Sequence, residues 1–393
     1  MKLFLKINFL LLFLLIIAVK SGYSQISTSE LAGQVNTITT AVPFLLIAPD
    51  ARAGGMGDGG VSSLPDVNSN HWNASKFAFI DKNMGFGISY SPWLRALVPD
   101  INLAYISGYK RLDKMQTISA SLLYFSLGDI TFTDFVGNVT GQYRPNEFAV
   151  DIAYSRKLSE DFSGGIAFRY IYSNLTSGQF VGSQSTHPGQ SVAADISSYY
   201  HKKITIAKQD AVFAAGINIS NIGAKISYTQ SKERDFIPIN LKIGPSLSMN
   251  LDEYNTINFL VDLNKLLVPT PNPDSITHRL PDVSIVNGIF HSFSDAPGGG
   301  KEELHEITYS VGLEYWYDKQ FAIRGGYFYE NPTKGNRQFF TLGAGIKYSV
   351  FGLDFAYLIP ASSEVKSPLA NTLRFSLTFD FEAFKEQNKD KSN

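Results

Sequence analysis

The cluster of five glycines within 54–60 is the stretch of this sequence that most resembles a ligand-binding loop. A phosphate-binding loop of the P-loop type ends in Lys-Ser or Lys-Thr and joins a strand to a helix. Residues 54–60 have neither the Lys nor a surrounding strand–loop–helix pattern. We therefore expect no nucleotide here. We interpret the glycines as tight backbone turns inside a segment that plugs the lumen of a β-barrel, since glycine adopts conformations closed to other residues.

Catalytic and metal-binding patterns are also missing. The sequence has no G-x-S-x-G nucleophile motif, its six His residues lack metal-type spacing, and it has no Cys. His291, Ser292 and Asp295 lie close together, but in an expected loop, where local hydrogen bonding is the simpler explanation. The sequence thus predicts a protein that is not an enzyme, without catalytic, metal or cofactor sites. An outer-membrane lipase or protease is the less favoured alternative.

The composition favours a membrane protein that crosses the bilayer with strands and not with helices. Charged residues make up 18%, below the roughly 25% usual in soluble domains, while aromatic residues reach 13%. After the first twenty residues, no apolar run approaches the ~20 residues of a spanning helix. Alternating barrel strands produce this combination, because only every second side chain meets lipid. The net charge of −1 gives no reason to expect nucleic acid as a partner.

The first 24 residues have the pattern of a signal peptide. Lys2 and Lys6 precede the apolar run 9–19, and small residues stand at Gly22 and Ser24. We expect cleavage before Gln25. The alternative, a membrane anchor, needs a longer apolar segment.

From Met84 onward, apolar and polar residues alternate with period two. The run Leu373, Phe375, Leu377, Phe379 and Phe381 alternates with Arg374, Ser376, Thr378 and Asp380. We expect strands to begin near residues 84, 99, 115, 145, 162, 189, 210, 238, 254, 306, 320, 337, 351 and 370. The predicted fold is all-β: a transmembrane antiparallel β-barrel of about fourteen strands over 83–382 in the bacterial outer membrane, contacting its lipid, with a disordered tail at 383–393.

The lengths of the connections favour this barrel over a soluble sandwich. Short segments at 110–114, 157–161, 251–253 and 318–319 alternate with long ones at 127–144, 173–188, 221–237 and 264–305. Outer-membrane barrels have short periplasmic turns and long outer loops. The segment 201–209 fits less well, being longer than the other short turns.

Aromatic residues near the expected strand ends could form the two girdles at the membrane interfaces. They are Tyr90, Trp93, Tyr170, Tyr172, Trp316, Tyr317, Tyr327 and Tyr348.

Residues 25–82 do not alternate, and their length suggests a periplasmic segment or a plug within the lumen. The candidate plug residues are Arg52, Gly54, Gly55, Gly57, Asp58, Trp72 and Asn73.

The longest expected loop is the candidate partner-binding element. It is flanked by a Pro-rich stretch at 268–273 and a Gly-rich stretch at 296–300. Long ordered loops often carry binding sites, although a plain solvated loop is the alternative. The candidate contact residues are Pro269, Pro271, Phe293, Asp295 and Pro297.

Several stretches together resemble the PorV family, the FadL-like outer-membrane proteins of the type IX secretion system. They are 40–60 (TAVPFLLIAPDARAGGMGDGG), His71-Trp72-Asn73, 145–149 (PNEFA), 225–228 (KISY), 265–271 (KLLVPTP), 293–297 (FSDAP) and 371–379 (NTLRFSLTF). The resemblance spans the mature chain with its spacing preserved. It departs at 73–75, where Asn-Ala-Ser replaces the Asn-Pro-Ala of the wider FadL-like group and removes a fixed φ.

The resemblance implies a role in protein export. Members of this family bind the folded C-terminal signal domains of cargo proteins. They take the cargo from the large translocon barrel. They carry the cargo to a surface attachment complex, where a sortase-like partner removes the signal and joins the cargo to lipopolysaccharide. The alternative with the same fold is a FadL-like channel for fatty acids or other hydrophobic small molecules.

Overall fold

The computed structural model describes residues 35–94, 98, 100–133, 136–176, 178, 180–181, 184–230, 234–272, 280–361, 369 and 371–381. The expected signal peptide and C-terminal tail lie outside the described residues. The chain divides into Met1–Val35 and Asn36–Asn393, and the second unit holds the fold described below.

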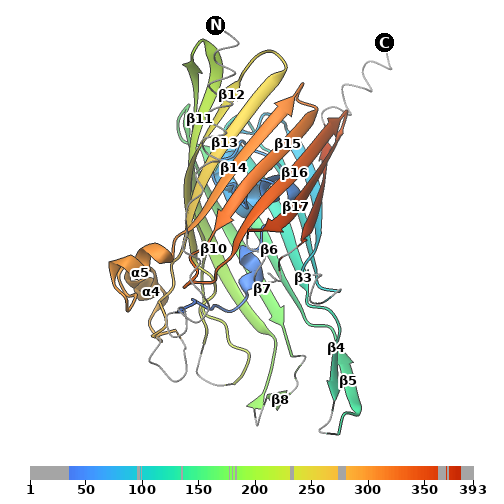
Figure 1. The fold of residues 1–393 in the computed structure, drawn as a ribbon, viewed down its shortest axis with the longest axis vertical. Coiled ribbons are helices and arrows are strands. Elements are labelled where there is room, and N and C mark those ends of the chain that lie inside the picture. The colour runs from blue at the N-terminus through green and yellow to red at the C-terminus, as the bar shows by residue number, and fades with distance from the viewer. Residues whose placement is uncertain are drawn as a thin grey trace. The chain divides into compact units, whose positions relative to one another are not determined.

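In the described part of the chain, fourteen antiparallel strands close into a barrel (Figure 1). Each strand pairs with its sequence neighbour in the barrel, and β1 meets β18 to close the ring. The strands are β1 (Met84–Pro92), β2 (Asn102–Arg111), β3 (Gln116–Ser126), β6 (Asn146–Lys157), β7 (Phe162–Asn174), β10 (Gly189–Ile206), β11 (Gln209–Gly223), β12 (Asn240–Asn250), β13 (Asn255–Leu266), β14 (Thr308–Tyr317), β15 (Phe321–Tyr329), β16 (Gln338–Tyr348), β17 (Phe351–Pro360) and β18 (Leu373–Asp380). The predicted barrel is confirmed, with each strand beginning within a few residues of its expected start.

Alternation along the strands separates a lipid face from a lumen face. On β6, Val150 and Ile152 are 40% and 64% exposed, whereas Asp151 and Ala153 are each 3% exposed. On β18, Phe375 and Leu377 face outward, while Arg374 and Ser376 are buried in the lumen. The apolar residues therefore form the outer surface of a closed sheet, as lipid contact requires.

Two of the expected girdle residues face inward instead. Trp93 and Trp316 are each 8% exposed, and both rings lie beside lumen cations. The guanidinium carbon of Arg374 is 5.7 Å from the Trp93 ring centre, and that of Arg324 is 5.4 Å from Trp316. The girdle prediction is wrong for these two residues. Indole rings are attracted to cations as well as to the membrane interface, and here the cations lie in the lumen.

The two barrel ends differ in the length of their connections. The segments 112–115, 158–161, 207–208, 251–254, 318–320 and 349–350 form tight turns at one end. The other end carries the longer loops, with the hairpins β4 (Ile130–Thr133)–β5 (Val139–Tyr143) and β8 (Phe180–Val181)–β9 (Gln184–Ser185), and helices α4 (Ile285–His291) and α5 (Gly300–His305) (Figure 1). By the usual asymmetry of outer-membrane barrels, the tight turns mark the periplasmic end.

The structure corrects the prediction that 201–209 is an unusually long turn. It is not a long turn, because β10 runs to Ile206 and β11 starts at Gln209. Ala207 and Lys208, with φ of 50° and 69°, make the two-residue turn between them, as expected for a tight hairpin with positive φ at both central positions.

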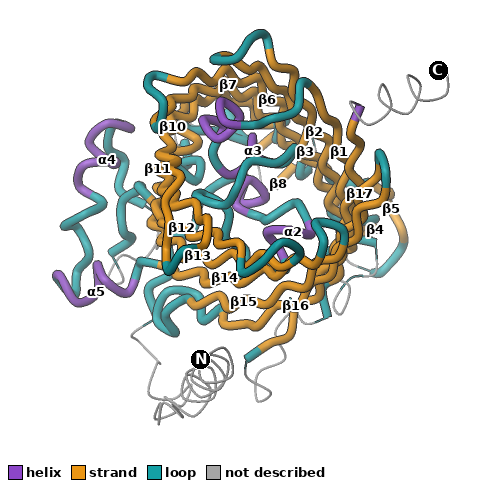
Figure 2. Tube along the Cα trace, turned by 90° about the horizontal axis from the view of Figure 1, so that it is seen from above, coloured by secondary structure: helices purple, strands orange, loops and turns teal. Residues whose placement is uncertain are grey.

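Residues 36–80 fill the lumen (Figure 2). They contain short helices only: η1 (Pro43–Leu46), α2 (Ala51–Gly54), α3 (Ser69–Trp72) and η2 (Ala74–Phe79). Phe44 and Leu45 of η1 join a buried cluster with Leu103, Tyr105 and Ile171 of the barrel wall. This apolar contact positions the segment, which we call the plug, against the inner face of the sheet. None of the helices in the described ranges is both long and apolar enough to cross a membrane.

Candidate functional site

The Gly-rich part of the plug touches the barrel wall through its backbone. Gly57 has φ of +69°, and a Cβ on it would lie 2.7 Å from the carbonyl oxygen of Tyr327. A Cβ on Gly55 would lie 3.1 Å from the Cα of Gly343, and one on Gly54 would meet the side chain of Arg374. These glycines therefore allow close packing of two backbones, and no phosphate site is needed to explain them.

Arg52 ties the plug to the wall through a chain of buried charges. It donates two hydrogen bonds to Glu314 of β14, at 3.0 and 2.9 Å, and one to Asp66 at 2.8 Å. Glu314 also accepts from Arg324 at 2.7 Å, and Arg324 donates to Asp354 of β17 at 2.7 Å. Removing one partner of a buried ion pair costs about 3–5 kcal/mol, so this network fixes the plug to three strands.

The other candidate plug residues also make specific bonds. Asp58 is ion-paired with Arg374 of β18. The indole of Trp72 donates to Asp50 at 2.7 Å, and Asp50 caps α2 by accepting from Ala53. The Asn73 amide donates to the carbonyls of Val61 and Ser198, each at 3.0 Å. Asn73 also caps η2 through Ser75, so the segment that lacks the family's Pro is held by side-chain hydrogen bonds.

The longest loop connects β13 to β14 and is anchored by buried ion pairs. Lys265 lies 3.0 Å from Glu303 and 2.6 Å from Glu306. Lys334, from the loop between β15 and β16, lies 2.6 Å from Glu302 and 3.0 Å from Glu306. These anchors hold α5 beside the barrel, outside the ring of strands (Figure 2).

Asn36 adds the start of the plug to the same anchor. Its backbone donates to Thr333, and its amide donates to Pro271 at 3.0 Å and to Glu302 at 2.9 Å. Burial alone would raise the pKa of Glu302, but the bonds from Lys334 and Asn36 hold that pKa below its usual range. The plug, the loop with α4 and α5, and the loop at 330–337 thus meet at one charged cluster.

The five candidate partner-binding residues differ in burial: two are exposed, two are buried and one is partly buried. Phe293 and Pro297 are exposed, as a contact residue must be. Pro269 and Pro271 are buried, which differs from that expectation: Pro269 packs beside Gly288 of α4, and the Pro271 carbonyl accepts from Asn36. Asp295 is partly buried, which raises its pKa, and it accepts from the Thr270 amide at 3.2 Å. The buried members support the loop rather than face solvent.

The exposed apolar residues of this loop were missed by the sequence reading, except for Phe293. Phe290 is 72% exposed, Leu304 is 62%, Val286 is 61% and Phe293 is 51%. We call these four side chains the outer apolar patch. The sequence contains them as large apolar residues within a long loop, whereas the predicted contact residues lay mostly in the Pro-containing stretches.

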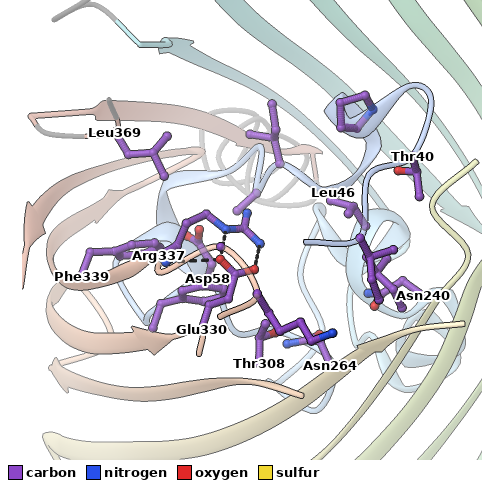
Figure 3. Close-up of a pocket in the computed structure, with 18 of the residues that line it drawn as sticks. Thr40, Leu46, Asp58, Asn240, Asn264, Thr308, Glu330, Arg337, Phe339 and Leu369 are labelled. Atoms are coloured by element: carbon purple, nitrogen blue, oxygen red, sulfur yellow. Dashed lines mark hydrogen bonds and ion pairs between the residues drawn. The ribbon is translucent and has the colours of Figure 1, made fainter. Parts of the chain in front are cut away.

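A cavity of about 420 Å³ opens between the plug and the outer ends of the strands (Figure 3). Thr40 and Leu46 of the plug, Asn240 and Asn264 of the wall, and Glu330 of a loop line it. Glu306 and Lys334, which anchor the long loop, line it too. The ion pairs that anchor the long loop therefore also form part of the cavity wall.

The described residues offer no arrangement for hydrolysis or metal binding in the outer loop. The Ser292 hydroxyl donates to the carbonyl of Ile289, and Asp295 accepts from Thr270, so neither is directed at His291. No group of three or more His, Asp or Glu side chains in the described parts could hold a metal ion. What the site offers is binding surface: an apolar patch on an anchored loop, and a cavity lined by both apolar and charged side chains.

Comparisons with known proteins identify relatives of this chain. The model of the family described as "Type IX secretion system protein PorV" matches residues 30–273. The comparison with curated protein sequences finds no match.

Solved structures resemble the fold. The toluene transporter TodX of Pseudomonas putida shares 13% identity at a TM-score of 0.50, over 88% of this chain and 98% of its own. A second TodX structure shares 11% identity at a TM-score of 0.50, over 84% and 98%. A FadL homologue of Pseudomonas aeruginosa shares 11% identity at a TM-score of 0.44, over 88% and 100%. At such low identity the TodX likeness concerns the barrel architecture alone.

Proposed function

The chain belongs to the PorV family of type IX secretion system proteins and is a barrel of the bacterial outer membrane, and from this premise we propose that it is the cargo-binding shuttle subunit of that system. It binds the folded C-terminal signal domain of a cargo protein at its outer loops. It receives the cargo from the large translocon barrel and delivers it to the sortase-like surface attachment complex. It performs no covalent chemistry itself.

The observation that carries this proposal is the outer apolar patch on an anchored loop. Solvent-exposed phenylalanines such as Phe290 and Phe293 cost free energy unless a partner covers them. The ion pairs of Lys265 and Lys334 hold the loop before any partner arrives. A loop that is already ordered loses less conformational entropy on binding, which raises affinity.

The plugged lumen supports the same proposal. Arg52, Asp58 and Asn73 bind the plug to the wall from several sides. A lumen that is closed in this way leaves the outer loops as the surface for a folded protein domain, which is far larger than the cavity of about 420 Å³.

Deleting Pro269–Gly300 tests the proposal. The deletion, rejoined by a short flexible linker, removes α4 and three residues of the outer apolar patch while leaving every barrel strand. It is expressed in a host lacking the native gene, and barrel assembly is checked by heat-modifiable migration on gels. We expect an assembled barrel that no longer supports surface display of cargo. Normal display by the assembled deletion would place cargo binding elsewhere and contradict the proposal.

A FadL-like channel for hydrophobic molecules is the second candidate. Its support is the cavity, whose wall includes Phe328, Leu358 and Leu369, together with a fold shared with toluene transporters. A channel requires a passage that continues past the plug, whereas a shuttle requires bound cargo. Capture of secretion machinery and of cargo from the native host separates the two candidates.

A further inference from the structure

The outer cavity holds one more positive charge than its own carboxylates neutralise. Its lining includes four cations, Lys242, Lys334, Arg337 and Arg374, and three carboxylates, Asp58, Glu306 and Glu330. The carboxylates are all engaged, Asp58 by Arg374, Glu306 by Lys334 and Lys265, and Glu330 by Arg337. Within the described part of the chain, Lys242 alone among these cations has no ion pair.

Lys242 is held in place by packing and makes no close ion pair in the described residues, although the carboxylates of Asp262, Asp58 and Asp195 act on it at longer range. It is 8% exposed, and its ammonium lies 4.3 Å from the ring centre of Trp72. A buried ammonium strongly favours an anion beside it. Arg374, also in the lining, has a buried Nε that finds no acceptor in the described residues. The Arg374 guanidinium is already paired with Asp58, so Lys242 is the cation of the lining that remains without an ion pair.

The residues beside Lys242 select for the rest of the ligand. In the sheet register, Lys242 of β12 stands opposite Asn264 of β13, which stands opposite Thr308 of β14. All three line the cavity, and in the described structure none of their side-chain polar groups bonds to another protein group. The amide of Asn264 and the hydroxyl of Thr308 lie on neighbouring strands, about 4.8 Å apart, and can form hydrogen bonds with the main-chain groups of a peptide in the cavity. An alkyl chain would leave these polar groups without partners.

We propose that this cavity binds the C-terminal carboxylate of an extended peptide, with Lys242 as the charge partner and Asn264 and Thr308 along the main chain. This inference rests on the proposed function: the peptide is the end of the cargo's C-terminal signal domain. The domain body covers the outer apolar patch, and its last residues enter the cavity past Glu306 and Lys334. A volume of about 420 Å³ lies in the range of small ligand pockets, roughly 300–1,000 Å³.

The test measures binding of synthetic peptides to the full-length protein in detergent. The probe is a short peptide with the C-terminal sequence of a type IX cargo signal domain, made once with a free carboxylate and once as the carboxamide. Two of the three tryptophans, Trp72 and Trp93, line the cavity, so their fluorescence reports occupancy. We expect the carboxamide to bind about tenfold to a hundredfold more weakly, as loss of a charge-assisted bond implies. Lys242→Met should remove that preference, while Lys208→Met at the periplasmic turn keeps it.

Each outcome decides the assignment. Equal binding of acid and amide to the native protein would overturn it, whatever the fold of the Lys242→Met variant. Binding of laurate with no binding of the peptide acid would assign the cavity to a free carboxylic acid and overturn the peptide assignment. Cargo capture by an assembled Lys242→Met protein, together with an unaltered preference for the peptide acid, would overturn the subsite and leave the shuttle function standing.

Discussion

Individual side chains of the outer loop divide into those that are exposed and those that hold the loop. Phe290 and Phe293 are exposed, whereas Pro269 and Pro271 are buried. The sequence could indicate the loop but not this division. Exposure in a loop depends on contacts with distant residues such as Asn36 and Phe236, and no local periodicity encodes those contacts.

Replacing both Phe290 and Phe293 by Ser should weaken cargo capture by about tenfold or more, since buried aromatic anchors dominate interface energies. Barrel assembly should be unchanged, because both side chains are largely in solvent. The measurement is the amount of signal-domain cargo retained on the immobilised protein. Tyr254→Ser is the matched control, because Tyr254 is 52% exposed at the periplasmic end. Equal cargo retention by the native protein, the double variant and Tyr254→Ser would show that the outer apolar patch does not bind cargo.

Lys334→Met should loosen the long loop without opening the barrel. Lys334 is buried and bonds both Glu302 and Glu306, so its removal leaves two carboxylates short of a partner, a loss of about 3–5 kcal/mol for a buried pair. We expect faster proteolytic cleavage within the loop and unchanged heat-modifiability. Arg144→Met, which breaks an exposed pair with Asp129, should leave the cleavage rate of the long loop as it is. A variant as resistant as the native protein would show that the anchor is not needed.

At the scale of elements, the strands were the most predictable part. Lipid contact imposes a period of two on every strand, so the alternation is local and strong. The extension of β10 and β11 to a turn at Ala207-Lys208 was not predictable in the same way. Beyond Tyr200 both faces meet solvent, as at Lys202 and Lys203, and the alternation that marks a strand disappears there.

Leu377→Arg on β18 should destabilise the assembled barrel by roughly 2–4 kcal/mol, if the site lies near the membrane midplane. The sequence alone suggests that Ser376→Arg is tolerated better, because Ser376 faces the lumen. The structure changes that expectation. The Ser376 hydroxyl accepts from the Ala51 amide at 2.8 Å and lies 2.7 Å from the hydroxyl of Ser89, so the plug already fills this space.

Both substitutions should therefore reduce the heat-modifiable fraction, while Leu377→Phe should not. Assembly of Leu377→Arg at the native level would mean that this strand face does not meet lipid.

For the whole molecule, the plug is the feature that sequence could least define. The sequence indicated a segment of suitable length with Gly-rich turns. Its path depends on partners far along the chain, such as Glu314 for Arg52 and Arg374 for Asp58. Lys242 was missed for the same reason, since an isolated Lys in a strand gives no sign that its neighbours leave it unpaired.

A plug fixed on several sides predicts a closed lumen. In planar bilayers, the native protein should show no sustained ion current. Arg52→Ala should produce intermittent current, because it leaves Glu314 with one cation fewer and frees the plug from β14. Arg144→Ala, which affects only an exposed loop pair, should behave like the native protein. A steady current through the native protein would favour the channel over the shuttle.

Binding of type IX cargo at the outer loops is the property that distinguishes the proposed shuttle from a channel. The most direct measurement is affinity capture of the tagged protein from the outer membrane of its native host, with the Pro269–Gly300 deletion captured in parallel. We expect the native protein to retain proteins with C-terminal signal domains together with the large translocon barrel, and the assembled deletion to lose the cargo. Retention of neither cargo nor translocon by the native protein would contradict the proposed function.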